Sequence, residues 1–227
     1  MCGRYTLTAE LGELEARFDF EATDLQYTPS YNIAPSQPVL AVLGDGANRA
    51  GYLRWGLVPS WAKDPAIGSR MINARAETLA DKPSFRQALR KRRCLILANG
   101  FYEWQRIGKT KQPMYLRLQG HQPFAFAGLW EVWRDAAGTP LHTCTIVTTA
   151  ANAVLQPIHE RMPVILDPAA EAVWLDGSVT TPHDLLPLLQ PYRAEDMQAY
   201  AVSTEVNAPR NNAPSCIAPI HPEVSEA

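Results

Sequence analysis

Five strand-like segments follow one another closely between residues 94 and 149, and this spacing restricts the fold more than any other feature of the sequence. They cover residues 94–98, 101–105, 114–118, 124–134 and 142–149, and each is rich in β-branched, aromatic or aliphatic residues. Turn-forming segments such as Asn99-Gly100 separate them, and these gaps are too short for the crossovers that parallel strands need. We therefore expect an α+β fold in a single domain. Its mostly antiparallel β core, barrel-like or made of two packed sheets, is flanked by short helices.

The rest of the chain predicts further strands and the short helices. Strands are expected at 38–43 and 52–57, on either side of a Gly44-Asp45-Gly46 turn, and at 163–166 and 198–203. Helices are expected at 8–20, 84–93, 152–158, 168–175 and 181–189, with Thr8 and Thr181 as N-cap residues of the first and last. No repeat or linker divides the sequence. Residues 1–220 are therefore predicted to form one domain, and residues 221–227 a loose tail.

Composition and cysteine usage exclude several classes of protein. The chain has 227 residues, of which 46% are hydrophobic, and this is enough for a sizeable core. No apolar run approaches the roughly 18 residues that cross a bilayer, and the N-terminus lacks the pattern of a signal peptide. We therefore expect a cytoplasmic protein without membrane contact. The four cysteines are scattered without the spacing of metal ligands, so we expect no metal and no cofactor.

Positive charge is concentrated in one stretch of a chain whose formal net charge is −2. Residues 82–111 contain nine lysines and arginines, beginning with Lys82, and one acidic residue, Glu103. The overall charge argues against a protein that coats nucleic acid indiscriminately. The local basic stretch is consistent with contact to phosphate groups, although the arginines at 90–93 are more typical of a solvated helix face.

Cys2 directly follows the initiator methionine, and this position has chemical consequences. A small second residue normally allows removal of Met1, which would leave Cys2 with a free amine and a thiol on adjacent carbons. Such a 1,2-aminothiol condenses with an aldehyde. The amine forms an imine, and the thiol then closes on the same carbon to give a five-membered thiazolidine. The amine is competent near neutral pH because an α-amino pKa is about 7.7–8.0.

Five further polar clusters stand in apolar surroundings. Taken in order with Met1-Cys2-Gly3-Arg4, they resemble the SOS response-associated peptidase family, whose members are abasic-site processing proteins that crosslink themselves to DNA. The resemblance covers nearly the whole chain. The clusters are Tyr31-Asn32-Ile33-Ala34-Pro35, Asn73-Ala74-Arg75-Ala76-Glu77, Gly100-Phe101-Tyr102-Glu103-Trp104, Ile158-His159-Glu160-Arg161-Met162-Pro163 and Val206-Asn207-Ala208-Pro209-Arg210-Asn211-Asn212.

The resemblance implies that Cys2 forms a thiazolidine with the ring-opened sugar of an abasic site in single-stranded DNA and so protects the site in the DNA damage response. It also implies that Cys2, Asn73, Glu103 and His159 are catalytic. A self-processing peptidase activity is proposed for the family, but it need not operate here, because Met1 alone precedes Cys2 and its simple removal suffices. These residue types suit the reaction, because an acid must open the closed sugar and dehydrate the carbinolamine. Glu103 beside aromatic side chains, or His159, can supply that proton. Asn73 can donate and accept hydrogen bonds without changing charge.

The expected partner is single-stranded DNA containing abasic sites, with junctions of single and double strands as a candidate position. We expect a monomer that associates with the nucleoid through DNA. A guanidinium binds phosphate bidentately, but ion pairs with Glu77 or Glu160 are the alternative for the arginines. The tryptophans either stack on bases or pack in the core. The residues expected to bind DNA are Gly3, Arg4, Asn32, Pro35, Trp61, Arg75, Lys82, Trp104, Arg161 and Arg210. Asn32 and Pro35 are also candidates for shaping the pocket around Cys2, and Arg210 for bracing the site.

Two other functions fit parts of the sequence. Class II glutamine amidotransferases also begin Met-Cys-Gly and use the N-terminal cysteine as nucleophile. That class usually has an aliphatic residue where this chain has Arg4. Hydrolysis of glutamine without DNA would favour it. The second alternative is a module that binds single-stranded DNA without forming a covalent adduct.

Overall fold

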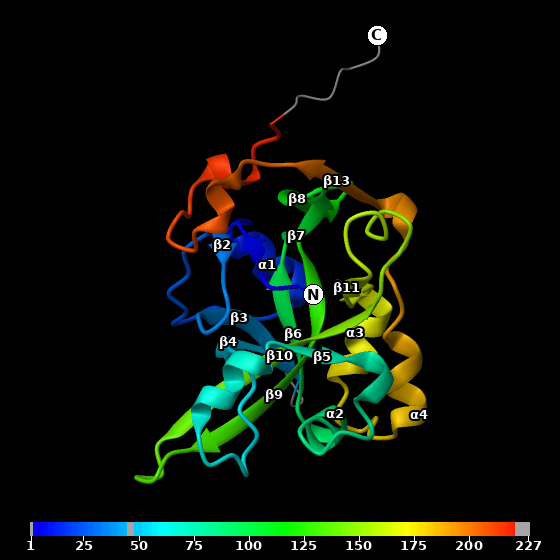
Figure 1. Ribbon diagram of the computed structural model, residues 1–227. Helices are drawn as coiled ribbons and strands as arrows, with labels where there is room; N and C mark the ends of the chain where they lie inside the picture. The colour runs from blue at the N-terminus through cyan, green and yellow to red at the C-terminus, as the bar shows by residue number, and fades with distance from the viewer. Residues whose placement is uncertain (1, 45–47, 221–227) are drawn as a thin grey trace.

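Five strands close into a barrel in the computed structural model, which describes residues 2–44 and 48–220 (Figure 1). Each strand pairs with the next in the order below, and the ring closes because the last pairs with the first. Only the pairing of β10 with β4 is parallel within this ring. The strands are β10 (Pro140–Ala150), β4 (Asn48–Trp55), β3 (Pro38–Gly44), β6 (Arg93–Ala98) and β9 (Phe124–Arg134).

A second, antiparallel sheet lies against the barrel and carries the N-terminal segment. Its strand order is β13 (Met197–Ala201), β8 (Thr110–Leu118), β7 (Gly100–Ile107), β1 (Tyr5–Leu7) and β2 (Ser30–Ile33). Tyr5 joins the two sheets, because its buried ring contacts Trp55 of β4 at 5.4 Å and Phe126 of β9 at 5.6 Å between centroids. Edge-to-face packing of this kind fixes β1, and therefore the residues before it, on the barrel.

Strand β10 extends past its barrel partners and pairs there with two short strands. β5 (Asn73–Arg75) runs parallel to it, with Asn73 opposite Ile146. β11 (Arg161–Pro163) runs antiparallel to it, with Arg161 opposite Ala150. A third short strand, β12 (Ile165–Leu166), pairs with β9. The two motifs that contain Asn73 and Arg161 are therefore brought to opposite edges of β10.

Short helices cover the ends and sides of the sheets, and the prediction of an α+β domain with a mostly antiparallel, barrel-like core is confirmed. Within the described residues, no helix is long and apolar enough to cross a membrane. The α-helices are α1 (Leu11–Phe18), α2 (Arg86–Lys91), α3 (Pro168–Leu175) and α4 (Pro182–Leu185). The 3₁₀ segments are η1 (Pro65–Arg70), η2 (Ala76–Thr78), η3 (Leu186–Leu188), η4 (Ala194–Asp196), η5 (Thr204–Asn207) and η6 (Pro214–Ile217).

Two predicted helices are wrong in part or whole. Residues 153–158 form successive turns. The side-chain oxygen of Asn152 accepts the amides of Val154 and Leu155, as an N-cap residue does, but Pro157 has no amide hydrogen for the backbone bond that would continue a helix. The predicted helix at 181–189 has its expected Thr181 cap but ends at Leu185, since the residue before Pro187 disfavours a continued α-helix.

The predicted N-cap Thr8 is also wrong. Helix α1 begins at Leu11 after Glu10, and the Thr8 hydroxyl instead accepts a hydrogen bond from the Asn99 side chain at 2.6 Å. Two expectations lie outside the described residues: the centre of the Gly44-Asp45-Gly46 turn and the tail at 221–227. The division of the chain at residue 220 stays a prediction.

Arg93 departs from the expected solvated face of basic residues, because it is buried at the start of β6. Its guanidinium donates to the carbonyls of Leu89 and Arg90 in the last turn of α2. It also donates to the carbonyls of Trp174 and Asp176 at the end of α3. One side chain thus satisfies orphan carbonyls at the C-termini of two helices, where positive charge is favoured.

We expect Arg93→Ala to lower the free energy of unfolding by about 3 kcal/mol, because buried carbonyls lose a charged donor. Urea unfolding measures this change. Arg90→Ala is the matched control, since Arg90 is exposed on the same helix and its loss should change stability by about 0.5 kcal/mol or less. Equal stability of the two variants would contradict this role of Arg93.

Candidate functional site

Cys2 lies beside strand β7 because β1 pairs with that strand. Tyr5 is opposite Phe101, and the amide of Tyr102 donates to the carbonyl of Arg4 at 2.9 Å, so the residues before β1 run toward Glu103. The Cys2 side chain is fully buried, with its Sγ 4.0 Å from the Arg4 carbonyl oxygen. Burial and then the charge of Glu103 raise the pKa of the Cys2 thiol well above its usual range. The thiol is therefore protonated near neutral pH.

Asn73 contacts Cys2 directly from strand β5. Its Nδ2 donates to the Cys2 carbonyl oxygen at 2.7 Å. Its Oδ1 is buried and has no hydrogen-bond partner within the part of the chain that the structure describes. A buried, unpaired carboxamide oxygen is costly in a folded protein, and it is available to accept a hydrogen bond from an amine or a sugar hydroxyl.

Glu103 is buried on β7, with 3% of its surface exposed. Burial raises the pKa of its carboxyl group, while His159 and the amide of Trp104 act in the opposite direction. The charge of Glu103 raises the pKa of the Cys2 thiol, and His159 lowers the pKa of the Glu103 carboxyl group, so Glu103 lies within electrostatic reach of both residues. A carboxyl group with a raised pKa is suited to giving and taking a proton near neutral pH.

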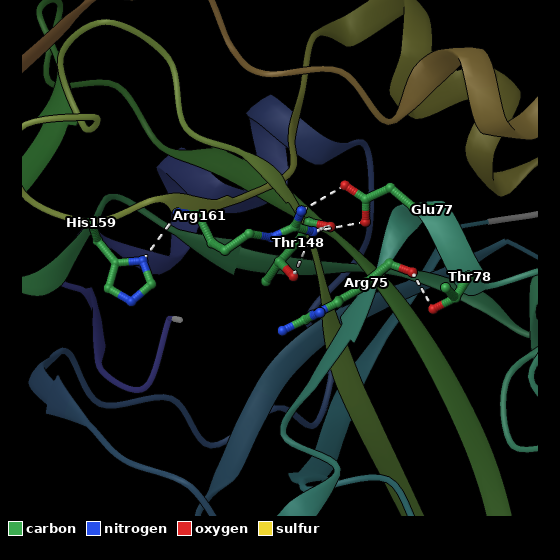
Figure 2. A network of polar contacts seen from close by, with 6 residues as sticks. All are labelled: Arg75, Glu77, Thr78, Thr148, His159 and Arg161. Carbon is green, nitrogen blue, oxygen red and sulfur yellow. Dashed lines mark hydrogen bonds and ion pairs between the residues drawn. The ribbon is translucent and has the colours of Figure 1, made fainter.

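His159 lies two residues before the start of β11, and its ring is fixed by the backbone. Its Nδ1 accepts a hydrogen bond from the amide of Arg161 at 3.0 Å (Figure 2). Because an amide can only donate, Nδ1 is the unprotonated nitrogen of the neutral ring, and Nε2 carries the hydrogen. Neutral His159 therefore presents a donor at Nε2.

The four residues predicted to be catalytic converge from separate parts of the chain. Asn73 contacts Cys2 by a hydrogen bond, Glu103 acts on the Cys2 thiol, and His159 acts on Glu103. They come from the segment before β1 and from β5, β7 and the residue pair before β11. Two sheets and two short strands are needed to assemble them. Their catalytic roles stay predictions.

Arg161 is held by an ion pair rather than presented to solvent. Its Nη1 and Nη2 contact the two carboxylate oxygens of Glu77 at 2.6 and 2.9 Å, and Nη2 also donates to the Thr148 carbonyl at 2.7 Å (Figure 2). The hydrogen bond from Arg161 is the main reason that the pKa of Glu77 is lowered. This is the alternative that the sequence left open for Arg161, and a phosphate contact would require the pair to open.

Arg75 has the opposite environment, although it lies two residues from Glu77. Its side chain is exposed at the end of β5 and extends away from Glu77 (Figure 2). Among the described residues, its guanidinium makes no hydrogen bond or ion pair. Lys82 is likewise exposed, after η2. Both side chains can bind a phosphate without breaking an existing contact.

Asn32 is 2% exposed, so this arrangement does not present it to DNA, and its expected DNA contact stays a prediction. Its Oδ1 accepts from Arg4 Nη1 at 2.7 Å, and its Nδ2 donates to the carbonyls of Val206, Ala208 and Asn211. The side chain thus has no hydrogen left to offer a ligand. It clamps the segment 206–211 onto β2, which agrees with the alternative of shaping the site.

Arg4 and Trp104 brace the same segment. Arg4 Nη1 donates to the Val206 carbonyl at 2.6 Å, and its guanidinium lies over the Trp104 ring at 5.8 Å. The Trp104 indole nitrogen donates to Asn207 Oδ1 at 2.8 Å. These contacts link the neighbours of Cys2 and Glu103 to the C-terminal part of the chain.

The remaining predicted DNA contacts differ in exposure. Trp61 is 60% exposed in the turn before η1, which leaves a ring face accessible for stacking. Gly3 and Pro35 are half-buried, and Arg210 is exposed in the segment after η5. Sequence reasoning assigned no role to Thr148, because one threonine in a β-branched strand carries no distinguishing signal. Only the long-range pairing of β5, β10 and β11 reveals its contact with Arg161.

Comparison with known proteins agrees with this arrangement. The abasic site processing protein YoqW of Bacillus subtilis (strain 168) is 52% identical over 221 residues, which cover 96% of this chain and 99% of that protein. The abasic site processing protein HMCES of Xenopus tropicalis is 36% identical over 228 residues, with coverage of 86% and 67%. A crystal structure of a Bacteroides thetaiotaomicron protein superposes with a TM-score of 0.87 at 26% identity and covers 96% of this chain and 99% of its own.

The family assignment rests on a match across most of the chain. A model of the SOS response associated peptidase (SRAP) family matches residues 1–209, the region that holds all four converging side chains. The resemblance drawn from the sequence motifs is therefore confirmed, and the chain belongs to the SOS response associated peptidase family.

Proposed function

We propose that this protein, after removal of Met1, attaches covalently to abasic sites in single-stranded DNA through Cys2 and shields them from strand cleavage. The observation that carries the proposal is the convergence on Cys2 of a carboxamide, Asn73, and a buried carboxyl group, Glu103. Its relatives YoqW and HMCES, both named abasic site processing proteins, support DNA with abasic sites as the substrate. A monomeric, cytoplasmic protein that reaches the nucleoid through DNA is part of the same proposal.

The proposed reaction has three steps whose atoms balance. Protonated Glu103 donates to the ring oxygen of the closed sugar, the C1′ hydroxyl gives its proton to water, and the aldehyde is released at C1′. The Cys2 amine attacks this carbon to give a carbinolamine, which loses one water to form an imine. The Cys2 thiol adds to the imine carbon, its proton passes to the Glu103 carboxylate, and the nitrogen takes one proton from water to complete the thiazolidine. General acid–base catalysis of such steps is worth about 10²–10⁴-fold.

The burial of Cys2 gives Glu103 a second task. A thiol whose pKa is raised by burial is a poor nucleophile, because the thiolate is the reactive form. A nearby base that takes the proton as the sulfur attacks avoids a free thiolate in an apolar setting. Met1 must also leave, since the nitrogen of Cys2 is otherwise an amide and cannot form an imine. Arg75 and Lys82, exposed and unengaged, are the proposed phosphate contacts, with Trp61 as a stacking platform.

Intact-mass measurement of the purified protein tests this function directly. We expect loss of Met1, and after incubation with an abasic single-stranded oligonucleotide a heat-stable species equal to protein plus oligonucleotide minus one water. An oligonucleotide with an intact base at the same position is the control. Retention of Met1 together with failure to form the adduct would overturn the proposal. Glutamine hydrolysis without DNA would instead favour an amidotransferase, and binding without an adduct a non-covalent module.

Cys2→Ser separates imine formation from ring closure. The variant keeps a small second residue and the α-amine, but a hydroxyl closes the five-membered ring less effectively than a thiol. We expect it to give an adduct that borohydride traps and that heat destroys when borohydride is omitted. Denaturing gels of heated and reduced samples measure both. A heat-stable adduct without borohydride would contradict the proposed part of sulfur.

Glu103→Gln tests the proton shuttle through its pH dependence. Because burial raises the Glu103 pKa, the acid form persists above the usual range of a glutamate and is lost as pH rises through the raised value. We therefore expect the wild-type rate of adduct formation to fall as the pH rises through this raised pKa. In the variant the rate should be lower by more than about tenfold and this limb should vanish. An unchanged rate and profile, measured by single-turnover kinetics, would remove the assignment.

A further inference from the structure

Glu77 ties strand β5, which carries Asn73, to strand β11, which follows His159. Its carboxylate follows β5 directly, in η2, and reaches across β10 to pair with both terminal nitrogens of Arg161 on β11 (Figure 2). The Thr148 carbonyl of β10 accepts from the same guanidinium at 2.7 Å. A bidentate pair between planar groups fixes orientation as well as distance. The three neighbouring strands are thus locked by one side-chain bridge.

The other end of Arg161 controls His159. The amide of Arg161 donates to His159 Nδ1 at 3.0 Å, and this bond determines both the ring orientation and the tautomer. Any shift of Arg161 along or away from β10 moves that amide. Since His159 acts on the charge of Glu103, the same shift changes the environment of the proposed acid. The chain of contacts runs from Glu77 to Arg161, His159 and Glu103.

We infer that Glu77 is a positioning residue for the reaction at Cys2. It acts through Arg161 on the tautomer and placement of His159, and it does not contact the DNA. This inference rests on the proposed function and deepens it. Its carboxylate holds a guanidinium that in turn fixes a histidine, as outer partners commonly orient a functional histidine.

Two variants of Glu77 separate position from charge. Glu77→Asp keeps the charge but is one methylene shorter, and Glu77→Gln keeps the length but loses the charge. We expect both to lower the rate of adduct formation at saturating abasic DNA by on the order of tenfold, because small displacements of a reacting group are costly. The DNA concentration at half-saturation should be unchanged in Glu77→Asp, since its charge is conserved.

Glu160→Gln is the matched control. Glu160 precedes Arg161, is exposed, and makes no side-chain hydrogen bond or ion pair within the described residues. Its loss removes the same charge near the site, so it should affect half-saturation and salt dependence as Glu77→Gln does, and leave the rate at saturation unchanged. Equal rates in the Glu77 variants and this control would overturn the inference.

A measurement without DNA keeps the inference separate from the proposed function. The ¹⁵N resonances of the His159 ring, assigned by comparison with His159→Gln in mildly alkaline buffer, report the tautomer. We expect the Nε2-protonated form in the wild type and Glu160→Gln, and a mixture of tautomers in both Glu77 variants. Failure of the wild type to form an adduct would overturn the proposed function alone. An unaltered His159 tautomer in folded Glu77 variants, verified by their melting curves, would overturn the positioning role.

Discussion

The length of strand β10 is the constraint on which the rest of the site depends. On one edge it pairs with β9 over residues 140–146 and then with β11 over 148–150. On the other edge it pairs with β4 at 143–144 and then with β5 at 146–148. The barrel thus uses the first part of the strand, and the remainder has edges that must pair with other backbone. The strands that occupy these edges carry Asn73 on one side and follow His159 on the other, so the same hydrogen bonds that satisfy β10 also assemble half of the site.

The second half of the site depends on Tyr5 and the pairing of β1 with β7. This pairing sets Cys2 beside Glu103, and it also removes the thiol from water. Burial favours the neutral forms of both groups, since it raises the pKa of the Cys2 thiol and of the Glu103 carboxyl. Once Glu103 has given up its proton, its carboxylate can take the proton of the Cys2 thiol as the sulfur reacts, and this returns the buried carboxyl group to the neutral form that burial favours. The burial of the thiol and the carboxyl group is therefore consistent with a site where protons move between fixed partners.

Local sequence patterns predicted the strands correctly. They failed at positions where a proline or a residue distant in sequence decides the hydrogen bonds. Alternation and turn residues predicted the barrel strands, because each signal lies within a few residues of the structure it describes. The helix predicted at 152–158 is absent because Pro157 has no amide hydrogen to continue the turn that Asn152 caps. Thr8 is not the N-cap of helix α1, because the side chain of Asn99, which is distant in sequence, donates a hydrogen bond to its hydroxyl. The sequence predicted a solvated Arg93, because the carbonyl groups that accept its hydrogen bonds belong to two helices that only the tertiary fold brings together.

The arginines show why residue type alone does not separate a ligand contact from a structural one. Arg75 and Arg161 both stand in polar motifs, and each lies two residues from a catalytic candidate. Their difference comes from strand direction. Parallel pairing sets Arg75 opposite Thr148, with its side chain exposed, whereas antiparallel pairing brings Arg161 to the edge of β10 from which it reaches Glu77. A motif thus identifies which residues are available to the site. The register of β10 decides which of them stay accessible to a phosphate and which hold the proposed catalytic side chains in place.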